Sequence, residues 1–138
     1  ALEARVRGDG VPFLGICVGM QLLAAWGEEH GRHQGLGWIN GTVSAMEPAD
    51  PAIRIPHMGW NDVAPAVPHP LIRGGEAYFL HGYHLAADDA ADVIATSDHG
   101  GPMVAAVAHG NIAGVQFHPE KSQAYGIALL ERFLEWQP

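Results

Sequence analysis

The sequence predicts an α/β fold, and two observations predict it. Residues 11–16 form an apolar run typical of a buried strand, and residues 18–26 follow at once with the character of a helix. Short apolar segments then recur between turn-rich stretches along the rest of the chain. We expect antiparallel strands beside a parallel core, in one unit over residues 1–138, because no repeat, low-complexity tract or linker divides the chain.

The later elements are predicted from local patterns. Residues 1–7 resemble the end of an amphipathic helix, glycines mark residues 27–37 as a loop, and prolines mark residues 64–75 as turns. A tight turn over residues 109–111 predicts a hairpin between the strands that flank it. The predicted strands are residues 11–16, 38–46, 53–63, 77–86, 93–97, 103–108 and 112–117.

A last helix is predicted after residue 122. Ser122 is expected at its N-cap, since a serine hydroxyl can accept a hydrogen bond from the first helical N–H groups. A stripe of apolar residues at helical spacing is expected to face the core. The stripe consists of Ile127, Leu130, Phe133 and Leu134.

Cys17 is the only cysteine, and glycines stand two residues away on either side of it, in the order Gly15-Ile16-Cys17-Val18-Gly19. A nucleophile at a sharp turn from strand to helix needs such small neighbours. The backbone N–H of Val18 would help to hold a developing oxyanion, and the start of the helix would lower the pKa of the thiol. The same pattern also fits a buried structural cysteine at the start of a helix.

A base for this thiol is predicted at His118, which follows the apolar strand that ends near residue 117. In extended chain, residues two apart face the same way, so His118 and Glu120 can project toward one site. The carboxylate would then fix the tautomer of the imidazole. The alternative is a polar strand end where both side chains simply meet water.

The segments GICVGMQ (residues 15–21) and GVQFHPEKS (residues 114–122) together resemble the nucleophile and His-x-Glu motifs of class I, or triad, glutamine amidotransferases. Within that family, IPHMGWN (residues 55–61) and AYFLHGY (residues 77–83) are similar to segments of the glutaminase subunits of imidazole glycerol phosphate synthase. The resemblance implies a flavodoxin-like fold with a mixed, mostly parallel sheet flanked by helices. It also implies that the N-terminal strands, and a glycine-rich loop that supplies a second oxyanion donor, would precede residue 1.

The resemblance implies a glutaminase that needs no cofactor or metal. Cys17 would attack the carboxamide of L-glutamine, His118 would serve as general acid and base, and Glu120 would orient it. Gln21, one helical turn after Cys17, matches a substrate-binding position, and Gly82 and Tyr83 would complete the pocket. Relatives usually carry a hydroxyl residue where this chain has Gly82.

The same resemblance implies a partner. Ammonia would pass to a (β/α)₈ synthase subunit in a heterodimer, which would make imidazole glycerol phosphate and an aminoimidazole carboxamide ribotide in histidine biosynthesis. The positions that match the interface are Met58, Trp60, Asn61, Tyr78 and Lys121. Core packing is the alternative for the two aromatic residues. The histidines at 57, 81 and 84 crowd together, but they lack the spacing typical of a zinc site.

Composition excludes several classes of function. A net charge of -8 with seven Lys and Arg residues offers no basic patch for nucleic acid or an anionic membrane surface. No apolar stretch approaches the ~20 residues that span a bilayer, and one cysteine makes no internal disulfide, so we expect a cytoplasmic protein. Two alternatives remain open: another Cys-His-Glu hydrolase of the γ-glutamyl peptidase type, or a truncated, catalytically impaired fragment that binds the partner.

Overall fold

The computed structural model describes residues 1–138. Its main element is a six-stranded sheet with the order β1-β10-β9-β8-β5-β6. The strands of this sheet are β1 (Phe13–Ile16), β5 (His57–Pro65), β6 (Gly75–His81), β8 (Val93–Asp98), β9 (Pro102–His109) and β10 (Ile112–Val115). The strands β9 and β10 form the predicted hairpin, with Ile112 opposite His109.

A second, four-stranded sheet has the order β3-β2-β4-β7. Its strands are β2 (Ala24–Gly27), β3 (His33–Gln34), β4 (Ile39–Ala45) and β7 (Tyr83–Ala87). The longest helix is α2 (Gln123–Glu135), and α1 (Val18–Gln21) is one turn. Short turns of π- or 3₁₀-helix complete the chain: η1 (Ala4–Gly8), η2 (Ala90–Asp92) and η3 (Pro119–Lys121). Neither α-helix has the length and apolar character needed to cross a membrane.

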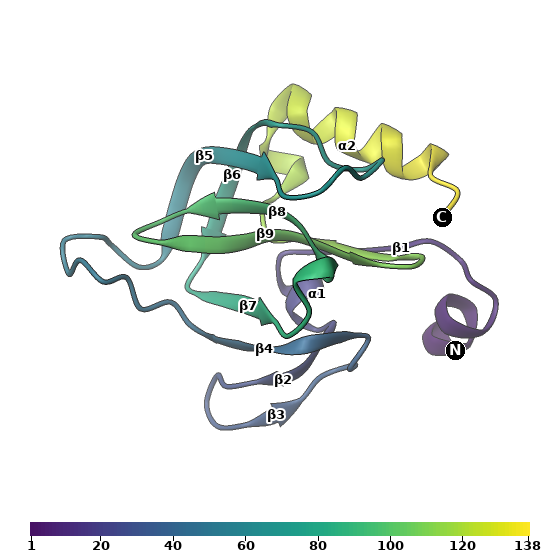
Figure 1. The fold of residues 1–138 in the computed structure, drawn as a ribbon, viewed down its shortest axis with the longest axis horizontal. Coiled ribbons are helices and arrows are strands. Elements are labelled where there is room, and N and C mark those ends of the chain that lie inside the picture. Colours follow the sequence, from purple (N-terminus) through teal and green to yellow (C-terminus); the bar gives the residue numbers. More distant parts are fainter.

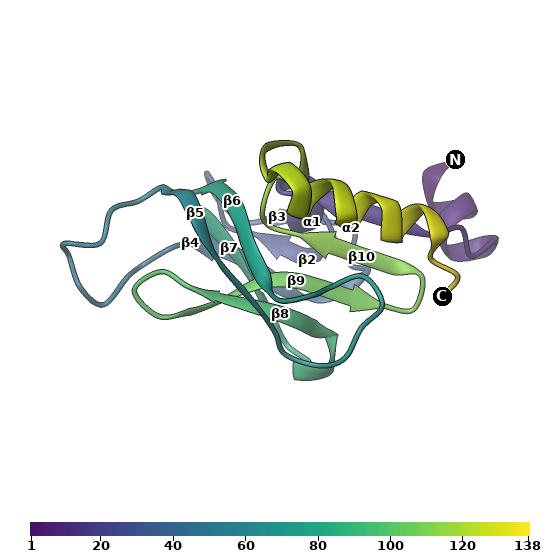
Figure 2. The ribbon, with the colours of Figure 1, turned by 90° about the horizontal axis from the view of Figure 1, so that it is seen from above.

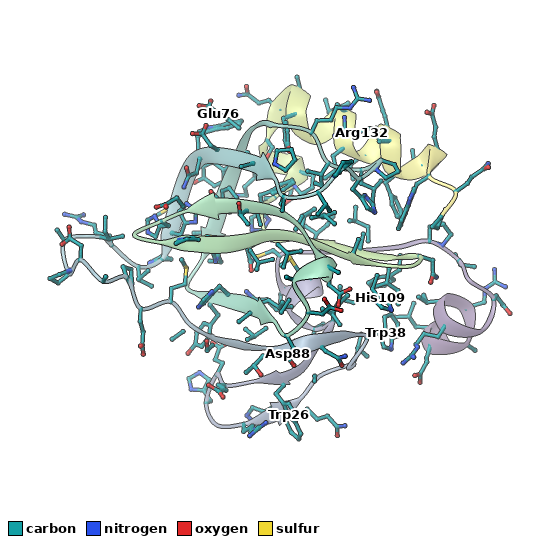
Figure 3. All side chains as sticks on the ribbon, viewed as in Figure 1. Trp26, Trp38, Glu76, Asp88, His109 and Arg132 are labelled. Carbon is teal, nitrogen blue, oxygen red and sulfur yellow. The ribbon has the colours of Figure 1, made fainter.

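The larger sheet lies between α2 and the smaller sheet, as both views show (Figures 1 and 2). Two apolar clusters fill the spaces on its two faces. One joins Leu129 of α2 to Phe79, Ala113 and Val115, and the other joins Ile112 to residues of β2, β4 and β7. Side chains of α2 also fasten the turn between β5 and β6, since Nε of Arg132 (labelled in Figure 3) donates to the Leu71 carbonyl at 3.0 Å.

The α/β class is confirmed, but the expected mostly parallel sheet is wrong for these residues. Only the pairs β1–β10 and β2–β4 are parallel, and the remaining pairs are antiparallel. The reason lies in the connections, because hairpins and short loops join antiparallel strands whereas parallel pairs need long crossovers.

Two predicted elements have different bounds. The helix expected over residues 18–26 ends at Gln21, because residues 24–27 pair with β3 and β4 as strand β2. The strand expected over residues 77–86 divides at Gly82, where the chain leaves the larger sheet as β6 and enters the smaller one as β7. In both places tertiary strand pairing overrides the local pattern.

The predicted apolar stripe of α2 is wrong in three of four positions. Ile127, Leu130 and Leu134 are exposed, and Phe133 alone packs against the core. The buried residues are Gly126 and Leu129. A Cβ built on Gly126 would lie 1.9 Å from the carbonyl oxygen of Pro119, so the helix turns its glycine side inward where the backbones touch. The periodicity of apolar residues predicts the helix. It does not predict which face is buried, because the contact of Gly126 with the Pro119 backbone determines that face.

Candidate active site

Cys17 lies at a sharp turn between β1 and α1. Its φ of 52° and ψ of -105° fall in a strained region that side-chain-bearing residues rarely adopt. A Cβ on Gly15 would lie 2.5 Å from the Gly19 carbonyl oxygen, whereas a Cβ on Gly19 would meet nothing within 4 Å. The turn therefore has the geometry of a nucleophile elbow, and the need for a small neighbour holds for Gly15 but not for Gly19.

His118 reaches the same edge of the sheet from the neighbouring strand. Strands β1 and β10 are parallel with Ile16 opposite Val115, and the backbone N–H of Cys17 donates to the Val115 carbonyl at 2.8 Å. The residues that follow both strands therefore leave the sheet side by side, at the carboxyl ends where α/β proteins usually bind their ligands.

The imidazole of His118 is held by Glu120. Its Nδ1 lies 2.5 Å from Oε1 of the carboxylate. Because a carboxylate accepts a hydrogen, Nδ1 carries the proton and Nε2 keeps a free lone pair, the state required of a general base. The Cys17 sulfur makes no hydrogen bond to His118: it contacts the Leu80 carbonyl at 3.8 Å, Nε2 of Gln116 at 3.6 Å and the backbone N–H of Val18. Catalytic hydrogen bonds often shorten only when substrate binds.

Ser122 fixes the backbone of His118. Its hydroxyl donates to the His118 carbonyl at 2.7 Å and accepts from the backbone N–H of Tyr78 at 2.9 Å, and the His118 N–H donates to the Tyr78 carbonyl at 2.9 Å. Ser122 occupies the N-cap position of α2, but its side chain makes no cap hydrogen bond. The expected cap is wrong because the hydroxyl is buried and binds β6 instead.

The pKa of the Cys17 thiol does not shift in the direction that the sequence predicted. Burial raises its pKa, and the charge of Glu120 raises it further, while hydrogen bonds from the Val18 backbone and the Gln116 side chain lower it. The expected net lowering is wrong, since α1 has only four residues and its terminus does not outweigh the loss of water around the sulfur.

The residues predicted to bind glutamine form a hydrogen-bonded group beside the elbow. Nε2 of Gln21 donates to the Tyr83 carbonyl at 3.1 Å and to Oε1 of Gln116 at 3.2 Å. The Gly82 carbonyl accepts from the backbone N–H of Met46. A Cβ on Gly82 would meet Ile55 at 3.6 Å, an ordinary contact, so a larger residue fits there. Sequence reasoning passed over Gln116, although it lies inside the His-x-Glu motif two residues before His118.

A hollow of about 220 Å³ opens next to this group. The elbow side of it is formed by Val18, Gln21 and Leu22, and the opposite side by residues of the smaller sheet and the loop between β2 and β3. Glu28 and Glu29 lie in its wall and give it negative charge. Its place beside the helix that follows Cys17 makes it a candidate recess for a small amino-acid ligand.

Most of the predicted interface residues share one face of the β5–β6 pair. Met58 and Trp60 are 62% and 47% exposed, so neither is a core residue. Trp60 pairs with Tyr78 across the strands with ring centroids 6.2 Å apart, and the Lys121 ammonium lies 5.8 Å from the Tyr78 ring centroid. Asn61 differs, because its amide nitrogen binds Nε2 of His57 at 3.1 Å and the Asp98 carbonyl at 2.7 Å.

The crowded histidines are bound to one another. Nδ1 of His57 lies 3.0 Å from Nε2 of His81, whose Nδ1 donates to the Tyr83 carbonyl at 2.8 Å. That carbonyl can only accept, so the direction of the whole chain from Asn61 through His57 to His81 is fixed. Burial lowers the pKa of both imidazoles to about 4, with nearby histidines adding to the effect. His84 takes no part in these hydrogen bonds, and no group of three or more metal-ligating side chains is placed to hold an ion.

A strained cysteine elbow beside a His–Glu pair has the geometry expected of a thiol-dependent hydrolytic site. The model of the glutamine amidotransferase class-I family matches residues 1–136, and the chain belongs to that family. Within it, the chain is similar to two proteins named imidazole glycerol phosphate synthase subunit HisH. It is 58% identical to the one from Zymomonas mobilis over 100% of this chain and 65% of that protein. It is 55% identical to the one from Caulobacter vibrioides over 100% of this chain and 67% of that protein.

The chain therefore spans about two thirds of the length of these relatives. Solved structures share the fold. The match to a crystal structure of a glutamine amidotransferase covers 97% of this chain and 65% of the chain in that structure. Its TM-score is 0.70, and the two sequences are 19% identical. The match to another glutamine amidotransferase, from Thermotoga maritima, covers 97% of this chain and 50% of the chain in that structure. Its TM-score is 0.63, and the two sequences are 20% identical.

Proposed function

We propose that this chain is the glutaminase subunit of an imidazole glycerol phosphate synthase, which hydrolyses L-glutamine and passes ammonia to a (β/α)₈ synthase subunit in histidine biosynthesis. The observation that carries the proposal is the strained Cys17 elbow at the end of β1, beside the His118–Glu120 pair that follows the adjacent parallel strand. The similarity to the HisH proteins supports the choice within the family.

The first half-reaction forms a thioester. Nε2 of His118 takes the proton of the Cys17 thiol as the sulfur attacks the side-chain carbonyl carbon of glutamine. The carbonyl oxygen becomes an oxyanion, to which the backbone N–H of Val18 donates. The tetrahedral intermediate collapses when the C–N bond breaks and the imidazolium gives its proton to the departing nitrogen, which leaves as ammonia. Glu120 stabilises the imidazolium and keeps its Nε2 directed at the reacting atoms.

The second half-reaction releases glutamate. His118, again neutral, takes a proton from water as the water oxygen attacks the thioester carbonyl. The C–S bond breaks, and the same proton returns to the Cys17 sulfur, so that the enzyme ends as it began. No redox step or cofactor enters this sequence.

Different residues bind the glutamine and the synthase subunit. Gln21, Gly82 and Tyr83 surround the glutamine, and because Nε2 of Gln21 is committed to two acceptors, its Oε1 is the atom left to accept a hydrogen bond from the substrate. Met58, Trp60, Tyr78 and Lys121 form the docking face of the synthase subunit, since large exposed apolar side chains favour association. Asn61 contributes from behind this face by holding His57.

The test is glutamate release from glutamine, measured with and without the synthase subunit of a HisH relative and its nucleotide substrate. Cys17→Ala is the blank, and Trp60→Ala is the variant of the docking face. We expect release that requires Cys17, rises with the partner and loses the rise in Trp60→Ala. Release that ignores the partner would favour a free-standing hydrolase of the γ-glutamyl peptidase type. Partner binding without Cys17-dependent release would favour a non-catalytic binding fragment.

A further inference from the structure

Gln116 is a fully buried polar residue at the centre of the site, between β10 and His118. Its backbone N–H donates to the Ala105 carbonyl at 2.8 Å, which fixes the main chain at the end of β10. Its side chain spans the gap between Cys17 and Gln21, with Nε2 at 3.6 Å from the sulfur and Oε1 at 3.2 Å from Nε2 of Gln21. A buried amide with both ends occupied has a defined place and little freedom to leave it.

The orientation of this amide follows from the hydrogen bonds around it. The Tyr83 carbonyl can only accept, so the group of Gln21 that lies 3.1 Å from it must be the NH₂ group. The second hydrogen of that NH₂ group points at Gln116, whose carbonyl oxygen must accept the hydrogen bond. The NH₂ group of Gln116 is therefore the end that faces the Cys17 sulfur. One backbone carbonyl thus decides the direction of two side-chain amides.

We propose that Gln116 is a further catalytic residue, which donates a side-chain N–H to the Cys17 thiolate and is held in that orientation by Gln21 and the Tyr83 carbonyl. An N–H donor close to sulfur stabilises the thiolate more than the thiol. In a site where burial opposes the charged form, this donor and the Val18 N–H are the groups that act in favour of it. Gln21 gains a second role as a positioning residue for Gln116.

The inference rests on the proposed function only in taking Cys17 as the nucleophile. The charged group that acts on the sulfur is Glu120, which opposes the thiolate, and His118 follows β10 at the same edge of the sheet. Neither group is changed by a substitution at position 116, so an effect on the thiolate can be assigned to the amide.

The experiment measures the rate at which iodoacetamide alkylates Cys17 as a function of pH, in the whole chain and in Gln116→Met. Methionine keeps the length and apolar volume of the side chain but removes its N–H donor. A hydrogen bond to a charged group contributes about 1.4 kcal/mol or more, which corresponds to a tenfold change in the fraction of thiolate. We expect alkylation at neutral pH to be on the order of tenfold slower in Gln116→Met, with an equal rate at high pH where every thiol is ionised.

Two further variants complete the test. Gln21→Met leaves Gln116 free to turn, and we expect a smaller slowing in the same direction. Ser97→Ala removes a buried hydroxyl on β8 that has no hydrogen-bond partner, and its alkylation profile should match that of the unchanged chain. Cooperative urea unfolding shows which variants are folded. If Gln116→Met does not fold, the alkylation profile of Gln21→Met tests the inference in its place.

An unchanged alkylation profile in folded Gln116→Met, or in Gln21→Met where that variant decides, overturns the inference and leaves Gln116 as a packing residue. Alkylation needs neither glutamine nor a partner, so the result is separate from the proposed function. A chain with the Gln116-dependent profile but no glutaminase activity would overturn the function and leave standing the hydrogen bond from Gln116 to the thiolate.

Discussion

The nucleophile and its base are held in different ways. The nucleophile arm, residues 13–21, presents Cys17 through a strained backbone angle and a helix of four residues. The base arm, residues 112–126, holds His118 through hydrogen bonds to Glu120 and to strand β6 and through one from Ser122. Strain makes a residue protrude, whereas hydrogen bonds set the direction of an imidazole. A thiol needs exposure to substrate, and a base needs a defined tautomer, so each arm has the constraint that its chemistry requires.

The two arms share one support, the end of strand β6. The Leu80 carbonyl contacts the Cys17 thiol, and the N–H and carbonyl of Tyr78 bind the base arm. The His57–His81 pair links this end of β6 to the start of β5 and is tied to the Tyr83 carbonyl. Breaking an arm or the support separately should therefore give distinct effects on stability and on the thiol.

The largest effect is expected from Gly126→Ala in the base arm. The added Cβ would lie 1.9 Å from a backbone oxygen of Pro119, which cannot rotate away as a side chain can. We expect a loss of at least about 3 kcal/mol in the free energy of unfolding, measured by urea denaturation. Stability within about 0.5 kcal/mol of the unchanged chain would show that α2 does not press on the base arm as described.

The shared support is tested by pH. Burial lowers the pKa of His57 and His81 from 6.5 to about 4, so between these values the unfolded chain binds more protons than the folded one. Stability should therefore fall as pH falls from 6.5 to 4, by at least about 3 kcal/mol, and the contribution of the pair should level off below pH 4. Urea midpoints across this range measure the slope.

A matched pair of variants assigns that slope. The double variant His57→Gln with His81→Gln should show a flatter dependence on pH, since the groups that titrate are gone. His33→Gln, at an exposed histidine of β3, should keep the slope. Equal slopes in all three proteins would place the pH dependence elsewhere.

A smaller loss is expected in the nucleophile arm from Gly15→Ala. Its Cβ would meet the Gly19 carbonyl oxygen at 2.5 Å, and α1 must shift to admit it. We expect about 2 kcal/mol of destabilisation and slower alkylation of Cys17. Gly19→Ala is the control, because its Cβ meets nothing within 4 Å, and both measurements should stay near those of the unchanged chain. The same loss in the two variants would contradict the account of the elbow.

The smallest of these effects on stability is expected from Ser122→Ala. The change leaves the Tyr78 N–H and the His118 carbonyl without their partner, which costs about 1–2 kcal/mol. Because the imidazole itself stays paired with Glu120, we expect kcat for glutamine hydrolysis to fall more than KM rises. Ser122→Thr, which keeps the hydroxyl, should recover part of kcat. A change in KM alone would assign Ser122 to substrate binding instead.

The local motifs could be predicted because they are short and contiguous. The elbow around Cys17, the hairpin over residues 109–111 and the His118–Glu120 pair each depend on residues close together in sequence. The fold class and the positions of most strands along the chain followed from the same local patterns. These are the features that residue spacing alone determines.

Features that depend on distant contacts could not be predicted. Ser122 was expected to cap α2, but a donor in β6, 44 positions earlier in the chain, holds its hydroxyl. The side chain of Gln116 meets Cys17 across 99 positions, and no local pattern indicates such a contact. The division at Gly82 likewise depends on β4, which pairs with β7 only after the chain has folded back. Periodicity carries no information about which sheet a strand joins.

Covalent labelling by a glutamine analogue with an electrophilic γ-diazoketone tests the central claim most directly, namely that the Cys17 elbow and His118 act together on the side chain of glutamine. Peptide mass spectrometry locates the label, in the unchanged chain and in His118→Asn, with and without excess glutamine. The account predicts a label on Cys17 alone, which glutamine prevents and which forms much more slowly in His118→Asn. A label on Cys17 that glutamine does not prevent, or that forms equally fast without His118, would contradict it.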